Sequence, residues 1–167
     1  GVFTRFMHNA QNSNSVVANN INALAIDRQG LIWVATDSGL DSYNPKTEIW
    51  SHFNDQSTSG GLSNNKVFAL LVDGQGQLWA GTDGGLNRFH PANASFTRVD
   101  VLKDLTITQL AAAADGSLWV GSRMGLYHLN VQNEEVIAEF QHEDDNNVSL
   151  LPGPLDALLV DHNGAVW

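Results

Sequence analysis

Residues 27–40 read DRQGLIWVATDSGL, and residues 73–86 repeat this pattern as DGQGQLWAGTDGGL. A third copy, ADGSLWVGSRMGL, occupies residues 114–126, and a fourth, DHNGAVW, occupies residues 161–167. Their tryptophans are Trp33, Trp79, Trp119 and Trp167, so one unit is between 40 and 48 residues long. Self-similarity at such a period indicates a fold built from repeated supersecondary units.

Each copy places the same residue types around its tryptophan. The glycine three residues before it is predicted to take a positive φ in a tight turn: Gly30, Gly76, Gly116 and Gly164. The Asp six residues before it, Ala113 in the third copy, is predicted to bond turn backbone: Asp27, Asp73 and Asp161. The residue two after it is small and is expected to make room for a neighbouring unit: Ala35, Gly81 and Gly121.

The first unit contains four short apolar runs, at residues 21–26, 31–36, 39–43 and 48–53. Gly, Pro, Asn and Asp separate them, which is typical of tight turns between strands. The tryptophan strand is apolar on both faces, so both faces of its sheet must be covered. These features predict an all-β fold, a β-propeller whose blades are four-stranded antiparallel meanders. The four repeat tryptophans are predicted to lie in the core.

The repeat predicts a partial propeller, with residues 1–167 forming part of one domain. We expect three complete blades at about 16–53, 63–99 and 105–140. Residues 3–6 resemble the end of a preceding blade, and residues 155–167 resemble the start of a following one. The chain is therefore expected to be a segment of a longer protein. Its outer blade faces would be covered by the rest of the propeller or by another copy of the chain.

Composition excludes several classes of function. Eighteen acidic residues face eight basic ones, giving a net charge of −10, which argues against nucleic acid or an anionic membrane as partner. Cysteine is absent, which excludes disulfides and thiolate chemistry. No apolar run has the roughly 18–20 residues of a membrane span, so no membrane contact by this segment is expected.

The candidates for catalysis or metal binding are weak. The six histidines have no zinc-binding spacing, and no nucleophile or phosphate-loop motif occurs, so we predict no catalytic residue, metal or cofactor. His8 and His142, two residues after a phenylalanine, read as polar loop residues rather than ligands. The run at 143–145 reads as a solvated loop rather than a calcium site, and the repeat Asp residues as turn formers rather than cation ligands.

Topology indicates where a ligand would bind. In a meander, the turn between the second and third strands emerges on the same rim as the blade-to-blade linkers, here 7–20, 54–66, 100–106 and 141–154. These linkers are rich in polar residues that suit recognition. We predict that five residues line the central mouth: Asn20, Asp37, Asn65, Asp83 and Arg123. The alternative is that they are solvated turn residues without a ligand.

The motif D-x-x-G-x-(L/I/V)-W followed by (V/A)-(A/G)-(T/S)-x-x-G-(L/I) resembles the two-component regulator propeller repeat, at residues 27–40, 73–86 and 114–126. The resemblance implies the periplasmic sensor region of a bacterial hybrid histidine kinase or diguanylate cyclase. We expect a non-enzymatic segment in which either a ligand, a small molecule or an oligosaccharide, or the dimer state of the rim biases a transmembrane switch. Streptogramin-lyase-like propellers share the Gly-x-(L/I)-Trp theme, so a propeller lyase is the alternative. A third reading is an interaction scaffold without a small ligand.

Overall fold

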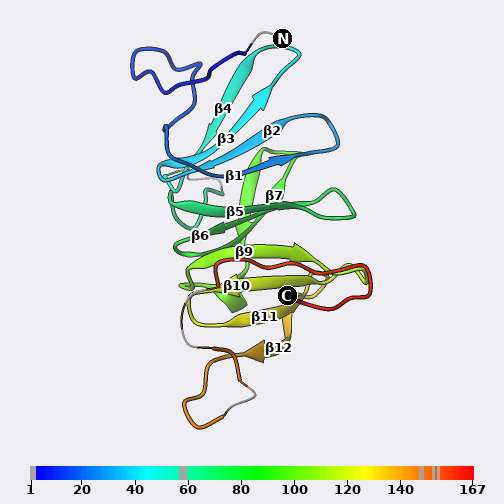
Figure 1. Cartoon of the computed structure of the whole chain (residues 1–167). Helices are drawn as coiled ribbons and strands as arrows, with labels where there is room; N and C mark the ends of the chain where they lie inside the picture. Colours follow the sequence, from blue (N-terminus) through cyan, green and yellow to red (C-terminus); the bar gives the residue numbers. More distant parts are fainter. Residues whose placement is uncertain (1–2, 57–59, 147–148, 152, 154) are drawn as a thin grey trace.

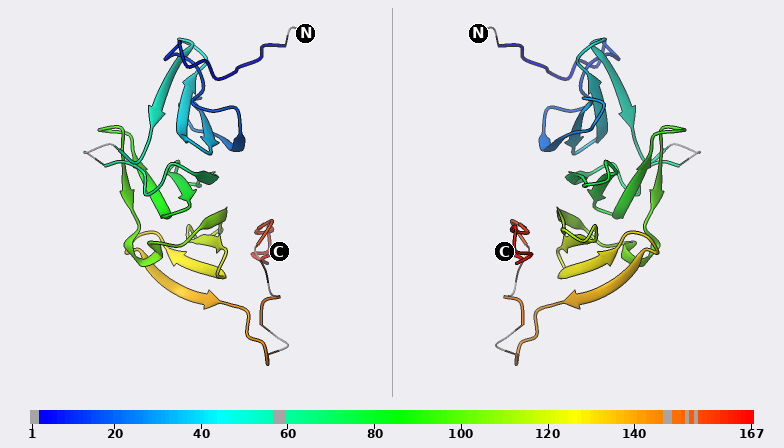
Figure 2. Two further views of the ribbon diagram at one scale, coloured as in Figure 1. Left: turned by 90° about the vertical axis from the view of Figure 1, so that its left-hand side faces the viewer. Right: turned by 90° about the vertical axis from the view of Figure 1, so that its right-hand side faces the viewer.

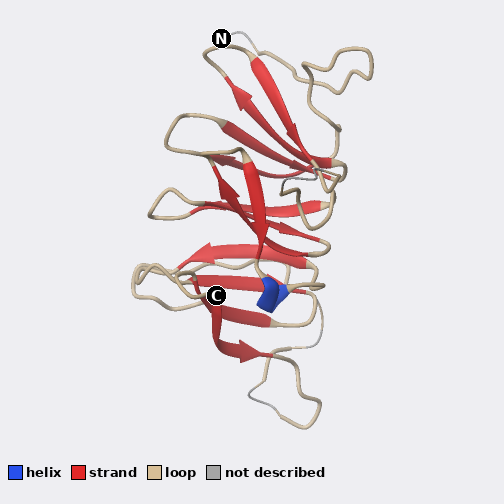
Figure 3. Cartoon of the chain, turned by 180° about the vertical axis from the view of Figure 1, so that it is seen from behind, coloured by secondary structure: helices blue, strands red, loops and turns tan. Residues whose placement is uncertain are grey.

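The computed structural model describes residues 3–56, 60–146, 149–151, 153 and 155–167. Parts of the predicted linkers 54–66 and 141–154 therefore lie outside the described residues. Over the described ranges the chain forms three four-stranded antiparallel sheets and one short 3-10 helix, η1 (Asp100–Leu102) (Figure 1; Figure 3). The predicted all-β fold is confirmed. Within this part of the chain, no helix has the length and apolarity to cross a membrane.

Each sheet is one meander whose strands pair in chain order. Blade 1 contains β1 (Ile21–Ile26), β2 (Ile32–Thr36), β3 (Gly39–Asn44) and β4 (Ile49–Phe53). Blade 2 contains β5 (Val67–Val72), β6 (Leu78–Thr82), β7 (Gly85–His90) and β8 (Ser95–Arg98). Blade 3 contains β9 (Ile107–Ala112), β10 (Leu118–Ser122), β11 (Leu126–Asn130) and β12 (Glu135–Phe140).

The three sheets stack face to face, with β1, β5 and β9 along one inner edge and β4, β8 and β12 outside (Figure 2). One apolar core fills the space between blades 1 and 2, around Trp33. A second fills the space between blades 2 and 3, around Trp79. The cores lie between sheets because each tryptophan strand is apolar on both faces, as the sequence predicts.

Two repeat positions explain how the blades turn and stack. The glycine before each tryptophan strand has a φ between 83° and 87° in all four copies, a region that glycine enters without steric cost. At Gly81, a Cβ would lie 2.7 Å from Cγ2 of Ile107 in the next blade. The small residue therefore admits a large side chain of the neighbouring blade, as predicted.

The repeat tryptophans do not share one degree of burial. Trp33 and Trp79 are each 1% exposed, so the core prediction is confirmed for both. Trp119 is only half-buried, stacked on His128 with ring centroids 4.3 Å apart. Trp167 is 74% exposed, and the prediction that it lies in the core is wrong. Within the described residues, no four-stranded sheet packs beyond Trp167 to cover its indole.

The flanking segments form less regular structure. Residues 3–6 belong to no strand, although the Phe6 ring packs 4.9 Å from that of Tyr43. Residues 155–167 form an isolated antiparallel bridge between Val160 and Val166. They lie beside the inner strand β9, where Gln109 Nε2 donates a 2.9 Å hydrogen bond to the Asp156 carbonyl (Figure 2). This segment extends the inner edge beyond blade 3.

Candidate functional site

The stacked blades have two rims. The linker rim carries the blade-to-blade linkers and the β2–β3, β6–β7 and β10–β11 turns. Backbone bonds hold these together, since Asp83 N donates to Lys66 O over 3.0 Å and Arg123 N donates to Thr106 O over 3.1 Å. The turn rim carries the β1–β2 turn, the β3–β4 turn and their equivalents in the other blades. The turns between second and third strands therefore share one rim with the blade-to-blade linkers, as the sequence predicts.

An axial hollow of about 800 Å³ lies at the linker-rim end of the inner strands. Residues from all three blades and from the segment after blade 3 line it: Ile21, Asn22, Phe68, Thr108, Gln109, Arg123, Gly153, Leu155 and Asp156. Four of these occupy one repeat position, eleven residues before the tryptophan: Asn22, Phe68, Thr108 and Asp156. Each unit thus contributes one side chain of different chemistry to the same hollow.

A β-bulge recurs at this position in every complete blade. In blade 1, Ile21 pairs with Thr36 and Ala23 with Ala35, so Asn22 is an extra residue between adjacent partners. The register skips in the same way at Phe68 in blade 2 and at Thr108 in blade 3. A bulge turns a side chain out of the regular alternation, and bulges are frequent beside functional sites. The backbone therefore directs these three side chains into the axial hollow.

Hydrogen bonds fix the bulge residue of blade 1. Asn22 Nδ2 donates to the Val67 carbonyl of blade 2 over 2.8 Å and to Asp37 Oδ1 over 3.0 Å. Asn20 Nδ2 donates to the second oxygen of Asp37 over 3.1 Å. The bonds from Asn22 and Asn20 lower the pKa of Asp37, which favours its ionised form. These contacts leave Asn22 Oδ1 as an acceptor at the edge of the hollow.

The five residues predicted for the mouth occupy different places. Arg123 lines the axial hollow, and Asn20 and Asp37 bond to each other beside Asn22. Asp83 accepts a 2.8 Å bond from the Thr106 hydroxyl on the same rim, but it does not line this hollow. Asn65 Nδ2 donates a 2.8 Å hydrogen bond to Asp55 Oδ1 inside its own linker, and Asn65 does not line the axial hollow either.

The bulge residues were not among those predictions, although the sequence contains a signal for them. Nine residues before each tryptophan the residue is always Leu, whereas eleven before it the residues are Asn, Phe, Thr and Asp. When one position of a repeat varies in polarity while its neighbours stay constant, the side chains at that position are not required for packing. The alternation of a regular strand does not show that a bulge turns this position toward the axis.

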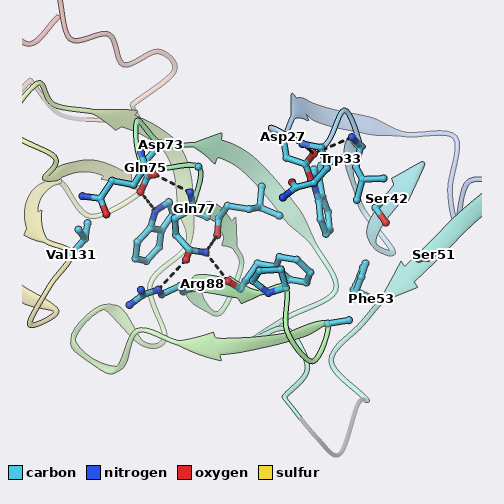
Figure 4. A pocket seen from close by; sticks show the side chains of 18 of the residues that line it. Asp27, Trp33, Ser42, Ser51, Phe53, Asp73, Gln75, Gln77, Arg88 and Val131 are labelled. Atoms are coloured by element: carbon cyan, nitrogen blue, oxygen red, sulfur yellow. Dashed lines mark hydrogen bonds between the residues drawn. The ribbon is translucent and has the colours of Figure 1, made fainter. Parts of the chain in front are cut away.

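A second hollow, of about 530 Å³, opens on the turn rim and extends around the edge of blade 2 (Figure 4). Trp33, Ser42 and Phe53 line the half toward blade 1, and Trp79 and Arg88 line the half toward blade 3. The sequence analysis did not identify this hollow, because its walls come from turns and outer strands of several units.

The weak catalytic and metal candidates have local structural partners. His8 Nδ1 lies 2.9 Å from the Val16 carbonyl, and His142 Nδ1 lies 2.7 Å from the Leu150 carbonyl, so both close their own linkers. Asp27 accepts bonds from the backbone of its turn, as predicted. In the described part of the chain, no group of three His, Asp or Glu residues could hold a metal ion.

Comparison with known proteins identifies the repeat. The family model of the two component regulator propeller matches residues 15–38 and 61–84, which include the tryptophan strands of blade 1 and blade 2. No curated protein matches the chain by sequence.

Solved structures share the fold. The chain superposes on the extracellular domain of BT4673 from B. thetaiotaomicron, assigned as a hybrid two component system, with a TM-score of 0.77 and 23% identity. The match covers 94% of this chain but 21% of that one. The extracellular domain of BT3049 from the same organism gives 0.69 and 18%, covering 98% and 27%. Virginiamycin B lyase from Staphylococcus aureus gives 0.64 and 12%, covering 88% and 47%. Two segments of the chain, residues 15–38 and 61–84, therefore match the repeat of the two component regulator propeller, and the chain folds as blades of a partial β-propeller.

Proposed function

We propose that this chain is a ligand-binding segment of the extracytoplasmic, periplasmic sensor propeller of a bacterial transmembrane signal transducer. The family repeat and the likeness to extracellular domains of two-component systems support this location and role. The ligand is a small molecule or an oligosaccharide that enters the axial hollow from the linker rim. Such a ligand transmits a signal only if it binds one arrangement of the propeller better than another.

The recurring bulge at Asn22, Phe68 and Thr108 carries this proposal. Three copies of one backbone irregularity turn three different side chains toward one hollow. Packing alone does not require this, because the leucine two residues later already packs between blades in the second and third copies. An aromatic ring with amide, hydroxyl and carboxylate groups around it suits a ligand with both apolar and polar faces.

A propeller lyase has less support. A lyase needs a proton-transferring group at its reaction site, and histidine is the most frequent one. Among the described residues that line the axial hollow, there is no histidine, and the candidate acid or base is Asp156. The likeness to virginiamycin B lyase lies at 12% identity and supports the fold alone. An interaction scaffold without a small ligand is the second alternative.

A thermal-shift screen of sugars, oligosaccharides and small metabolites tests the proposal, followed by calorimetry with each ligand found. Asn22→Ala and Phe68→Ala are expected to weaken binding of such a ligand by about tenfold each, which corresponds to about 1.4 kcal/mol. Gln132→Ala, on the opposite rim, serves as the matched control and is expected to bind normally. A ligand that binds both bulge variants as tightly as the parent protein would contradict the assignment of this hollow.

A further inference from the structure

The second hollow contains a charged side chain that is positioned by the protein and has no counter-charge. Arg88 of β7 is half-buried, and its guanidinium lies over the Trp79 ring, 5.7 Å from the centroid. Its Nε donates a 3.3 Å hydrogen bond to Gln77 Oε1. Among the described residues, no carboxylate lies within 4.0 Å of this guanidinium, and its two terminal nitrogens have no hydrogen-bond partner. The outer fork of Arg88 is therefore available at the wall of the hollow.

Gln77 is itself held in place. Its Nε2 donates to the Phe89 carbonyl over 2.6 Å and to the Leu78 carbonyl over 3.0 Å, so that Oε1 faces Arg88 (Figure 4). Figure 4 shows the guanidinium directed toward the Val131 side of the hollow, away from Phe53. An arginine oriented by a second side chain and an aromatic ring has lost much of its rotamer freedom before any ligand binds.

Blades 1 and 3 carry other residues at the two repeat positions that Gln77 and Arg88 occupy in blade 2. In blade 3 the equivalent pair is Ser117 and His128, and the serine hydroxyl lies 2.6 Å from His128 Nε2. In blade 1 the pair is Leu31 and Ser42, which brings no charge. Among the three described blades, blade 2 therefore is the one that holds a cation with free hydrogen-bond donors at the turn rim.

We propose that this hollow is a second binding site, distinct from the axial one, for a small aromatic monocarboxylate. A planar carboxylate matches the two parallel N–H donors of a guanidinium fork. Pro91 and Ala94, exposed in the turn between β7 and β8, line the same hollow and provide an apolar surface for the body of the ligand. A hollow of about 530 Å³ is within the range of small-molecule sites.

The charge of the ligand is limited by its surroundings. Asp73 also lines the hollow, and its carboxylate is occupied by Gln75 N, Gln77 N and the Trp79 indole, each at 2.9 Å. The chain carries a net charge of −10. One guanidinium in this field balances a single negative charge, so a monoanion fits the site better than a phosphate dianion.

Calorimetric titration with benzoate tests the proposal, with benzamide as the neutral isostere and phenyl phosphate as the dianion. Benzoate is expected to bind saturably, and both analogues about tenfold or more weakly. Arg88→Gln is expected to abolish benzoate binding. Arg88→Lys is expected to weaken it about tenfold, because an ammonium cannot form the fork. Gln77→Leu is expected to weaken it while Arg88 retains its charge.

Lys46→Gln removes a cation from the β3–β4 turn of the same rim and should leave benzoate binding unchanged. Thermal unfolding of each variant shows whether it is folded. If Arg88→Gln does not fold, Arg88→Lys still tests the proposal, because it keeps the cation and removes the guanidinium fork. The proposal is overturned if the parent protein does not bind benzoate at millimolar concentration. Equal binding of benzamide, or full binding by Arg88→Lys and Gln77→Leu, would also overturn it. None of these outcomes bears on the axial hollow, which Asn22→Ala and Phe68→Ala test separately.

Discussion

The indole Nε1 of Trp33 donates a 2.8 Å hydrogen bond to Oδ2 of Asp27, while Oδ1 of the same carboxylate accepts the N–H groups of Gln29 and Leu31. Asp73 and Trp79 repeat this arrangement in blade 2, with an Nε1 to Oδ2 distance of 2.9 Å. One carboxylate therefore closes the turn and fixes the central tryptophan. This dual role explains the six-residue spacing between the two residues.

Asp73→Ala should lower the free energy of unfolding by about 2 kcal/mol, because hydrogen bonds to a charged group contribute about 1.5–3 kcal/mol and the buried indole loses its acceptor. Urea unfolding monitored by tryptophan fluorescence measures the change. Asp161→Ala is the matched control, since its partner Trp167 is 74% exposed and can bond to water instead. Equal losses in the two variants would contradict the role of the buried indole.

The sequence predicted those features that depend on one residue and its neighbours in the chain. Gly30 and its equivalents could be predicted because a tight turn requires a residue with a positive φ. The small residue at Gly81 could be predicted because a large side chain of the neighbouring blade requires room there. The bulge at Asn22 could not be predicted, because it depends on the register between two strands, and a one-residue skip leaves the apolar pattern unchanged. The hollow at Arg88 depends on which side chains meet from separate blades. Repeat spacing specifies which positions are equivalent and does not specify these contacts.

Gly81→Ala should destabilise the packing of blade 2 on blade 3 by about 1–3 kcal/mol, the usual cost of overpacking a core. The added Cβ would lie 2.7 Å from Ile107 Cγ2 and 3.1 Å from the Ile107 carbonyl. Chemical denaturation measures the loss, and Gly81→Ala combined with Ile107→Leu, which removes the Cγ2 methyl and keeps the side-chain volume, should recover part of it. Gly74→Ala is the control, because nothing lies within 4 Å of its Cβ position. No recovery in the double variant would mean that the side chain of Ile107 is not the obstacle.

The linker before blade 1 should be held more firmly at low pH. The buried carboxylate of Asp41 accepts bonds from Val17 N over 2.6 Å and from His52 Nδ1 over 2.8 Å. His52 Nε2 lies 2.7 Å from the Ser13 carbonyl, so both ring nitrogens donate only when the imidazole is protonated. Partial burial disfavours that charge, but the bonds to Asp41 and Ser13 outweigh it and raise the pKa of His52.

A histidine with a raised pKa in the folded state contributes stability below its unfolded pKa, about 6.5, and loses it as the pH rises through the folded value. Burial also raises the pKa of Asp41, although the bonds from Val17 N and His52 oppose the rise, and this net shift has the same sign. The free energy of unfolding should therefore fall as the pH rises from about 6.5 through the raised folded pKa of His52. His52→Gln should flatten this slope, whereas His162→Gln, in an exposed turn, should keep it. Parallel slopes in all three proteins would exclude the His52 contribution.

The free face of blade 1 should drive association of the chain. Leu70 and Leu110 each pack on the core of the preceding blade, around Trp33 and Trp79 respectively. Leu24 occupies the same repeat position and is 64% exposed, with Ile26 beside it at 66%. We expect another copy of the chain, or further blades of the same propeller, to cover this face. Leu24→Glu should therefore raise the monomer fraction in size-exclusion chromatography with light scattering and leave the unfolding free energy nearly unchanged. Leu70→Glu should destabilise the fold instead, because it places a charge between blades. A parent chain that is monomeric at every concentration would show that this face needs no cover.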